Sequence, residues 1–159
     1  MINSTIGLIH TIFALLAMVL GGVVLLKTKG NRTHIRIGYA YVVCMLALNG
    51  TAFAIYNFGG FSIFHGFALI SLGALLGGMI PVIRKTKNWY PKHFYFMNWS
   101  VVGLYCAFWA ETGTRLLEGR HFWWVVALAS FGTAMVGMVI INRKAKQLFK
   151  QQSAQIPQH

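Results

Sequence analysis

Acidic residues are almost absent from this sequence of 159 residues, which carries two glutamates, no aspartate and 14 lysines and arginines. Only 10% of the residues are charged, whereas soluble domains carry about a quarter. A chain of this composition does not stay dispersed in water. The net charge of +12 would suit a nucleic-acid-binding protein, but the cations lie in short clusters between long apolar runs. That placement is typical of membrane proteins, so we do not expect nucleic acid as a partner.

Cysteine is equally scarce. Cys44 and Cys106 both lie inside apolar runs, so neither a disulfide framework nor a cysteine-based zinc cluster is predicted. The N-terminal stretch also lacks the basic residues and the small-residue cleavage site of a signal peptide. We therefore expect the first apolar run to remain in the protein as a helix in the lipid bilayer.

Long apolar runs are abundant. Crossing about 30 Å of hydrocarbon takes roughly 20 helical residues. The runs that meet or approach this length are 6–26, 37–58, 61–83, 94–110 and 122–141. Because hydrocarbon offers no hydrogen bonds to the backbone, each run must be helical. The sequence predicts an all-α, polytopic bundle of five transmembrane helices over residues 1–142 and a mobile, basic and polar cytoplasmic tail over residues 143–159.

The distribution of cations predicts the orientation. Twelve of them lie in three segments, namely residues 27–36, residues 84–92 and the stretch after residue 142. With five crossings these segments share one face, and the opposite face receives Arg115, Arg120 and both glutamates. Because loops rich in lysine and arginine stay in the cytoplasm, we expect the N-terminus outside and the C-terminus inside.

Histidine is the residue type best placed to carry chemistry. On the predicted topology, His10, His65 and His121 fall at the outer ends of three helices. His34 and His93 fall at the inner starts of the other two. Imidazole is the commonest metal ligand near neutral pH, so both layers are candidate cofactor sites.

Two kinds of site are consistent with the outer layer. His10, His65, His121 and Glu111, with Asn57 nearby, would suit zinc, copper or iron. Alternatively, His10 and His65 from facing helices could hold a haem iron from its two sides. A plainer interpretation competes for each histidine alone, because a polar tip on an apolar helix is stable at the membrane boundary.

A further site between His34 and His93 would create a relay of two haems across the membrane. About 22 residues of helix, or roughly 33 Å at 1.5 Å per residue, separate His34 from the outer layer. His34 and His93 also lie close to the predicted membrane boundary. We therefore favour one outer site, with His34 and His93 as secondary candidates for binding a cofactor.

Several short motifs resemble a known family. They are His10 in the first apolar run, the basic linker Lys29–His34, the segment Phe61–His65 and His93 before the fourth run. Together they resemble a bacterial family of predicted membrane proteins, domain of unknown function 2306, over about residues 5 to 140. The resemblance implies a small multi-pass protein of the bacterial inner membrane and brings no established activity.

Three functions remain in competition. The leading hypothesis is a redox protein that binds haem b or a transition metal and exchanges electrons with a quinone or a periplasmic partner. The second is a non-catalytic partner or assembly subunit, which could form a homo-oligomer through the small-residue face of Gly73 and Gly77. The third is a zinc-dependent lipid hydrolase with Glu111 as general base. Whether the chain is an enzyme is open at this point.

Overall fold

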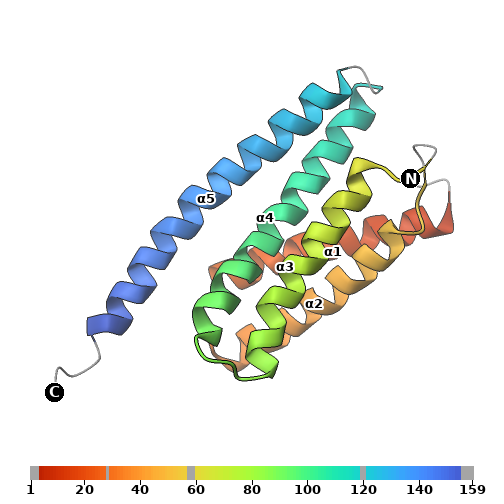
Figure 1. Cartoon of the computed structure of the whole chain (residues 1–159). Coiled ribbons are helices and arrows are strands. Elements are labelled where there is room, and N and C mark those ends of the chain that lie inside the picture. Colours follow the sequence, from red (N-terminus) through yellow and green to blue (C-terminus); the bar gives the residue numbers. More distant parts are fainter. Residues whose placement is uncertain (1–3, 28, 57–59, 119–120, 155–159) are drawn as a thin grey trace.

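The chain folds into five helices. The computed structural model describes residues 4–27, 29–56, 60–118 and 121–154, with side chains as far as residue 150. The helices are α1 (Thr5–Leu26), α2 (Arg32–Ala52), α3 (Ile63–Ile83), α4 (Trp89–Leu116) and α5 (Phe122–Ala154) (Figure 1). No strand occurs within these ranges. The prediction of an all-α chain is confirmed for the part that the structure describes.

Four of the described helices are long and apolar enough to cross a membrane. They are α1, α2, α3 and the Phe122–Lys150 part of α5. In contrast, α4 has 28 residues but carries Lys92, Glu111 and Arg115, which make it more polar. Helices of membrane-spanning character are therefore present as expected, and a fifth crossing by α4 stays a prediction.

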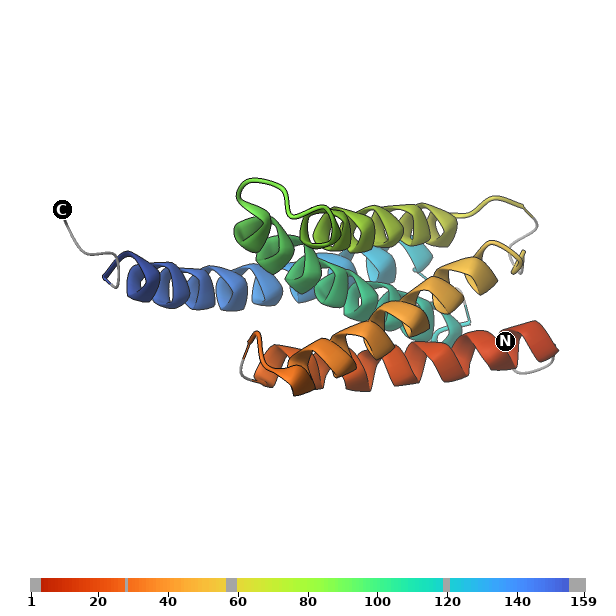
Figure 2. The same cartoon turned by 90° about the horizontal axis from the view of Figure 1, so that it is seen from below.

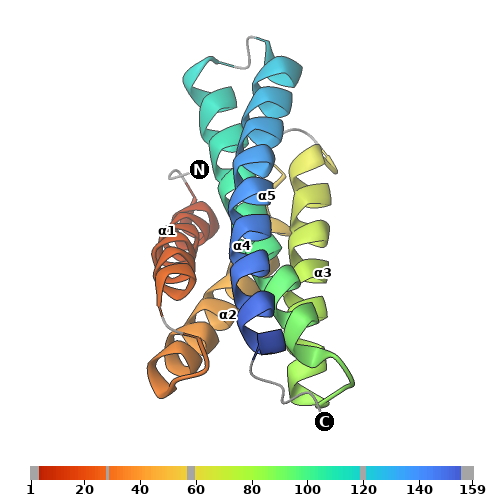
Figure 3. The same ribbon diagram turned by 90° about the vertical axis from the view of Figure 1, so that its left-hand side faces the viewer.

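Helix α4 lies at the centre of the bundle. It packs along α3 and α5 and also contacts α1, while α1 and α2 pair with each other. Figures 2 and 3 show α1 and α2 crossing on one side of α4, with α3 and α5 on its other sides. The main core lies between α1, α2, α3 and α4 and includes Ala17, Tyr41, Met45, Leu75 and Val101.

Polar caps set the starts of the first two helices. Ser4 Oγ accepts a hydrogen bond of 3.1 Å from the Gly7 N–H, and Asn31 Oδ1 accepts one of 2.7 Å from the His34 N–H. Such caps satisfy donors that have no partner within the helix. Helix α2 therefore begins before the predicted residue 37, in a polar turn that hydropathy alone did not identify.

Helix α5 continues well past the predicted end at residue 141. Its buried residues Ile141 and Ala145 pack with Phe94 of α4. The Phe149 ring contacts the Phe94 ring at 5.8 Å between centroids and the Tyr90 ring at 6.2 Å. The segment predicted to be a mobile tail is therefore helical as far as Ala154, because an apolar stripe continues through its basic residues.

The small residues of α3 pack inside the chain. A Cβ at Gly77 would lie 2.9 Å from the Phe96 ring, and one at Gly78 would lie 2.7 Å from Met97 Sδ. Gly73 has open space around it instead. Of the two glycines predicted to form a homo-oligomer contact, Gly77 is therefore covered by α4 of the same chain, and Gly73 is not.

Candidate functional site

Two cavities lie at opposite ends of the helix bundle. The first, the His34–His93 cavity, has a volume of about 340 Å³ and lies between the end of α1, the start of α2, the end of α3 and the start of α4. The second, the His10–His65 cavity, has a volume of about 180 Å³ and lies between the opposite ends of the same helices. No residue lines both, and the main core separates them. Each predicted layer of histidines thus contributes two imidazoles to one cavity.

The His34–His93 cavity brings its two imidazole rings close together. Their centroids lie 6.4 Å apart and the ring planes make an angle of 88°. His93 Nδ1 lies 3.1 Å from the Gly78 carbonyl oxygen, and because a carbonyl only accepts, this nitrogen carries the proton. The lone pair of neutral His93 is then on Nε2. His34 Nδ1 is buried and has no partner among the described residues.

Two lysines from distant parts of the sequence meet beside this cavity. Lys29 Nζ donates to the Val24 carbonyl at 2.6 Å and to the Leu25 carbonyl at 3.3 Å. Lys144 Nζ of α5 also donates to the Leu25 carbonyl, at 3.0 Å. Burial and the neighbouring Lys144 charge lower the pKa of Lys29 to about 8. This end of the bundle therefore holds positive charge with no glutamate beside it, since residues 111 and 118 lie at the opposite end of α4.

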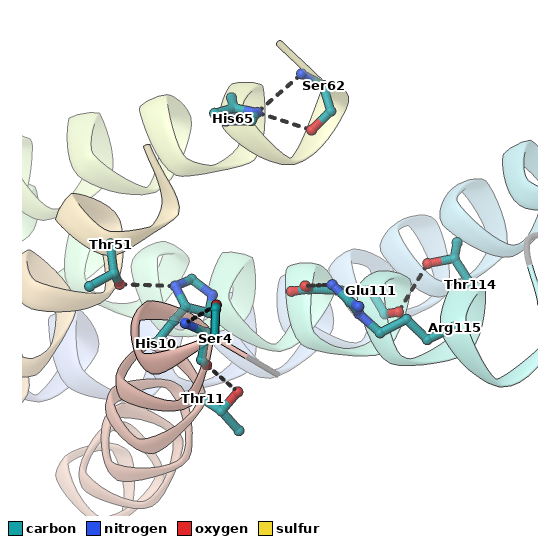
Figure 4. Close-up of polar contacts among 10 residues, drawn as sticks. Ser4, His10, Thr11, Thr51, Ser62, His65, Glu111, Thr114 and Arg115 are labelled. Carbon is teal, nitrogen blue, oxygen red and sulfur yellow. Dashed lines mark hydrogen bonds and ion pairs between the residues drawn. The ribbon is translucent and has the colours of Figure 1, made fainter. Parts of the chain in front are cut away.

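In the His10–His65 cavity, the hydrogen bond between His10 and Thr51 determines which ring nitrogen of His10 carries the proton (Figure 4). His10 Nδ1 lies 3.0 Å from Thr51 Oγ1. The Thr51 hydroxyl itself lies 2.9 Å from the carbonyl oxygens of Ala47 and Leu48, so its proton is directed to the helix backbone. The Thr51 oxygen then accepts from His10 Nδ1–H, which leaves the lone pair of neutral His10 on Nε2.

His65 has the opposite tautomer. The Ser62 backbone N–H donates to His65 Nδ1 at 3.0 Å, as part of a capping box at the start of α3. An accepting Nδ1 carries no proton, so Nε2 of neutral His65 is an N–H donor. That Nε2 is buried and has no hydrogen-bond partner among the described residues. His65 lines the cavity, and its Nε2 therefore carries a donor and not a lone pair.

The negative charge of Glu111, which lines this cavity, is partly balanced by a neighbouring arginine. Glu111 Oε1 accepts a hydrogen bond of 2.7 Å from Arg115, one turn along α4, and both residues line the cavity (Figure 4). His121 is exposed in a positive-φ conformation at the start of α5 and does not line it. Helix α5 packs mainly on α4, and its Phe122 ring also contacts the Phe64 ring of α3, at 6.1 Å between centroids.

The predicted four-ligand metal set is consequently not assembled. Within residues 4–27, 29–56, 60–118 and 121–154, no group of three or more His, Cys, Asp or Glu side chains is placed to hold a metal ion. Asn57, which was expected near this set, lies outside the described residues. The structure instead shows two cavities that are each lined by two histidines.

Two features of these cavities were not predicted from the sequence. Thr51 orients His10, and Lys29 and Lys144 place their charges together. A threonine about two helical turns before residue 58, the predicted end of the second apolar run, is a weak signal by itself. The pairing of Lys29 with Lys144 depends on where α5 passes the end of α1, which no local pattern in the sequence reports.

Comparison with known families agrees with the membrane-spanning character of the helices. Residues 7–143 match the model of a family described as "Predicted membrane protein (DUF2306)". The chain belongs to this family. The match includes all four histidines that line the two cavities and confirms the resemblance found from the short motifs. No curated protein and no solved structure matches the chain. Bacterial origin and the inner membrane stay predictions.

Proposed function

We propose that this chain is a multi-pass membrane protein that binds haem in the His34–His93 cavity and takes part in electron transfer. The observation that carries the proposal is the spacing of the two imidazoles, at 6.4 Å between ring centroids. Two imidazoles that bind one metal ion from opposite sides, with metal–nitrogen distances of about 2 Å, have centroids about 6 Å apart. The observed centroid spacing is close to this value.

The surroundings of His93 support a ligand role. Its Nδ1–H bond to the Gly78 carbonyl is the kind of outer contact that orients a metal-binding histidine and makes it a better ligand. The bond also leaves the Nε2 lone pair available. The aromatic lining supplied by Tyr39, Trp89 and Tyr90 suits a flat apolar macrocycle.

Charge gives a second line of support. Haem carries two carboxylates, and this cavity has Lys29 on its lining and Lys144 beside it. Both ammonium groups hydrogen-bond to backbone carbonyls, so an anionic ligand would supply the missing counter-charge. Bound haem provides reversible one-electron redox chemistry, which makes electron transfer the function that fits this donor set.

The membrane topology belongs to the same proposal. Lys29 and Lys144 both reach the Leu25 carbonyl, which supports a common face for the first basic linker and the basic end of α5. We place this face in the cytoplasm because lysine-rich segments stay there. Helix α4 is the fifth crossing in this arrangement. Its polar residues Asn98 and Ser100 are buried inside the bundle rather than exposed to lipid.

This assignment differs from the expected ligand pair. The sequence favoured His10 and His65, but the described ring contacts of His65 are with Phe53, Tyr56 and Phe61. Its accepting Nδ1 also leaves no lone pair for iron on Nε2. The inner pair is therefore the better haem site.

The test is the absorption spectrum of the full chain purified in mild detergent, before and after addition of haem. The expected result is a Soret band that saturates at one haem per chain. His34→Ala and His93→Ala should each abolish the low-spin spectrum of bis-histidine iron, whereas the matched control His121→Ala should leave it unchanged. A wild-type chain that takes up no haem, or keeps the same spectrum without His93, would contradict the proposal.

A further inference from the structure

We infer that the His10–His65 cavity is a second ligand site, which binds the head group of a lipid-soluble quinone. The inference goes beyond the haem proposal and does not depend on it, because no residue lines both cavities. It rests on a buried donor without a partner, on acceptors contributed by other helices, and on the small residues that line the space between them.

The buried donor is His65 Nε2–H. The side chain is only 3% exposed, and Nε2 has no hydrogen-bond partner among the described residues. Buried polar groups in folded proteins nearly always have a partner, and an unpaired one destabilises the folded state. A ligand that accepts a hydrogen bond at this position would remove that cost.

The ring of His65 is held in place before any ligand arrives. Its Nδ1 is bound to the Ser62 backbone N–H at 3.0 Å. One neighbour is Phe61, at 4.9 Å between centroids and 27° between planes, and another is Tyr56, at 5.0 Å and 34°. Since Nδ1 accepts, the ring cannot turn over to present a lone pair without losing the capping bond. The geometry selects a carbonyl or hydroxyl oxygen on the ligand rather than a metal ion.

Acceptors come from the other helices. His10 of α1 has its Nε2 lone pair available because Nδ1 donates to Thr51. Glu111 of α4 lines the same cavity and is paired with Arg115. Figure 4 shows His65 on α3, away from His10 and Glu111. A ligand with oxygen atoms on two sides of a ring would use both groups: a quinone carbonyl accepts from His65, and a quinol hydroxyl donates to His10 or Glu111.

The space between these polar groups suits a flat ring. The lining includes five small residues from the four helices, which leave room where larger side chains would fill the cavity: Ala14, Ala52, Ala68, Gly103 and Ala107. At Gly103 a Cβ would meet no atom within 4 Å. Leu104 and Phe108 add apolar surface to the same lining. Since α1, α2 and α3 have membrane-spanning character, the proposed ligand is an apolar molecule that dissolves in the bilayer.

The test measures binding of ubiquinone with one isoprene unit to the full-length chain in lipid nanodiscs, by calorimetry. The expected result is saturable binding at one molecule per chain. His65→Phe keeps an aromatic ring but removes the N–H, and it should weaken binding about tenfold, the usual effect of losing one hydrogen bond to a ligand. Gly103→Leu should abolish binding by filling the cavity, and Gly132→Leu on α5, where space is also open, should have no effect.

Two further measurements separate this site from the haem site. The haem-free variant His93→Ala should bind the quinone with unchanged affinity. A dimethylnaphthalene of similar shape, which lacks the carbonyls, should bind at least about tenfold more weakly than the quinone. Equal binding of both probes, no saturable quinone binding by the wild type, or a second haem that disappears in His65→Phe would each overturn the inference.

Discussion

The hydroxyl group of Tyr41 on α2 donates a hydrogen bond of 2.9 Å to Ser100 Oγ on α4. The Ser100 hydroxyl donates its own hydrogen bond to the Met97 carbonyl at 2.9 Å, which assigns Tyr41 as the donor. Both side chains are fully buried, at 1% and 0% exposure. This chain of bonds links α2 to the central helix α4 in the layer between the two cavities, although α2 and α4 share no extended helix–helix contact.

Tyr41→Phe should lower the free energy of unfolding by about 1 kcal/mol, in line with hydrogen bonds between membrane helices. The variant keeps the ring and removes only the hydroxyl. Tyr39→Phe is the matched control, because Tyr39 lies two residues away on the same helix and is 55% exposed. Unfolding by titration with sodium dodecyl sulfate provides the measurement. Equal losses for both variants would show that the Tyr41–Ser100 bond contributes nothing specific.

Gly78→Val should destabilise the protein by about 1–3 kcal/mol, the usual cost of overpacking. A Cβ at this position would lie 2.7 Å from Met97 Sδ and 3.3 Å from the Met97 backbone nitrogen. Gly73→Val, where the space is open, should change stability by less than about 0.5 kcal/mol. The same two variants also test whether the chain forms an oligomer through this surface. An oligomer that is seen by size-exclusion chromatography and is lost only in Gly73→Val would support the partner-subunit hypothesis.

Gly38→Leu should reduce haem affinity on the order of tenfold or more, as expected from overpacking costs of 1–3 kcal/mol. Gly38 lines the His34–His93 cavity, and a Cβ there meets no atom within 4 Å, so the added side chain would occupy the space of the proposed haem. Gly132→Leu introduces the same side chain away from both cavities and should bind haem normally. Titration with haem, followed at the Soret band, measures both. Unchanged affinity in Gly38→Leu would place the haem elsewhere.

The stability of the haem-free protein should rise with pH between about 8 and 10.5, the folded and the ordinary pKa of Lys29. Within this window the unfolded chain still holds the proton that the folded lysine has released, so a higher pH favours the folded state. The groups that interact with the Lys29 charge are Lys144, His34 and His93. Lys29→Met should flatten this part of the stability profile, and Lys27→Met, at an exposed position, should not. Identical profiles for the two variants would refute the assignment.

Much of the architecture could be predicted from the sequence because membrane helices follow local rules. Hydrocarbon forces apolar segments into helices wherever they occur, so five helices and both layers of histidines could be placed without knowledge of packing. The helix ends were less accurate. They depend on single caps such as Asn31, and on contacts such as those of Phe149 with α4.

The candidate sites could be predicted only in part, since the residues were foreseen but not their chemistry. Composition and hydropathy by themselves determined the membrane class and the two-layer placement of His10, His34, His65 and His93. Only the tertiary structure decided that His34 and His93 face each other closely, that His65 presents an N–H, and that Lys29 meets Lys144. The physical reason is that hydropathy acts on each segment separately. The pairing and the tautomer of an imidazole depend on single hydrogen bonds, which form only after the helices have packed at particular rotations.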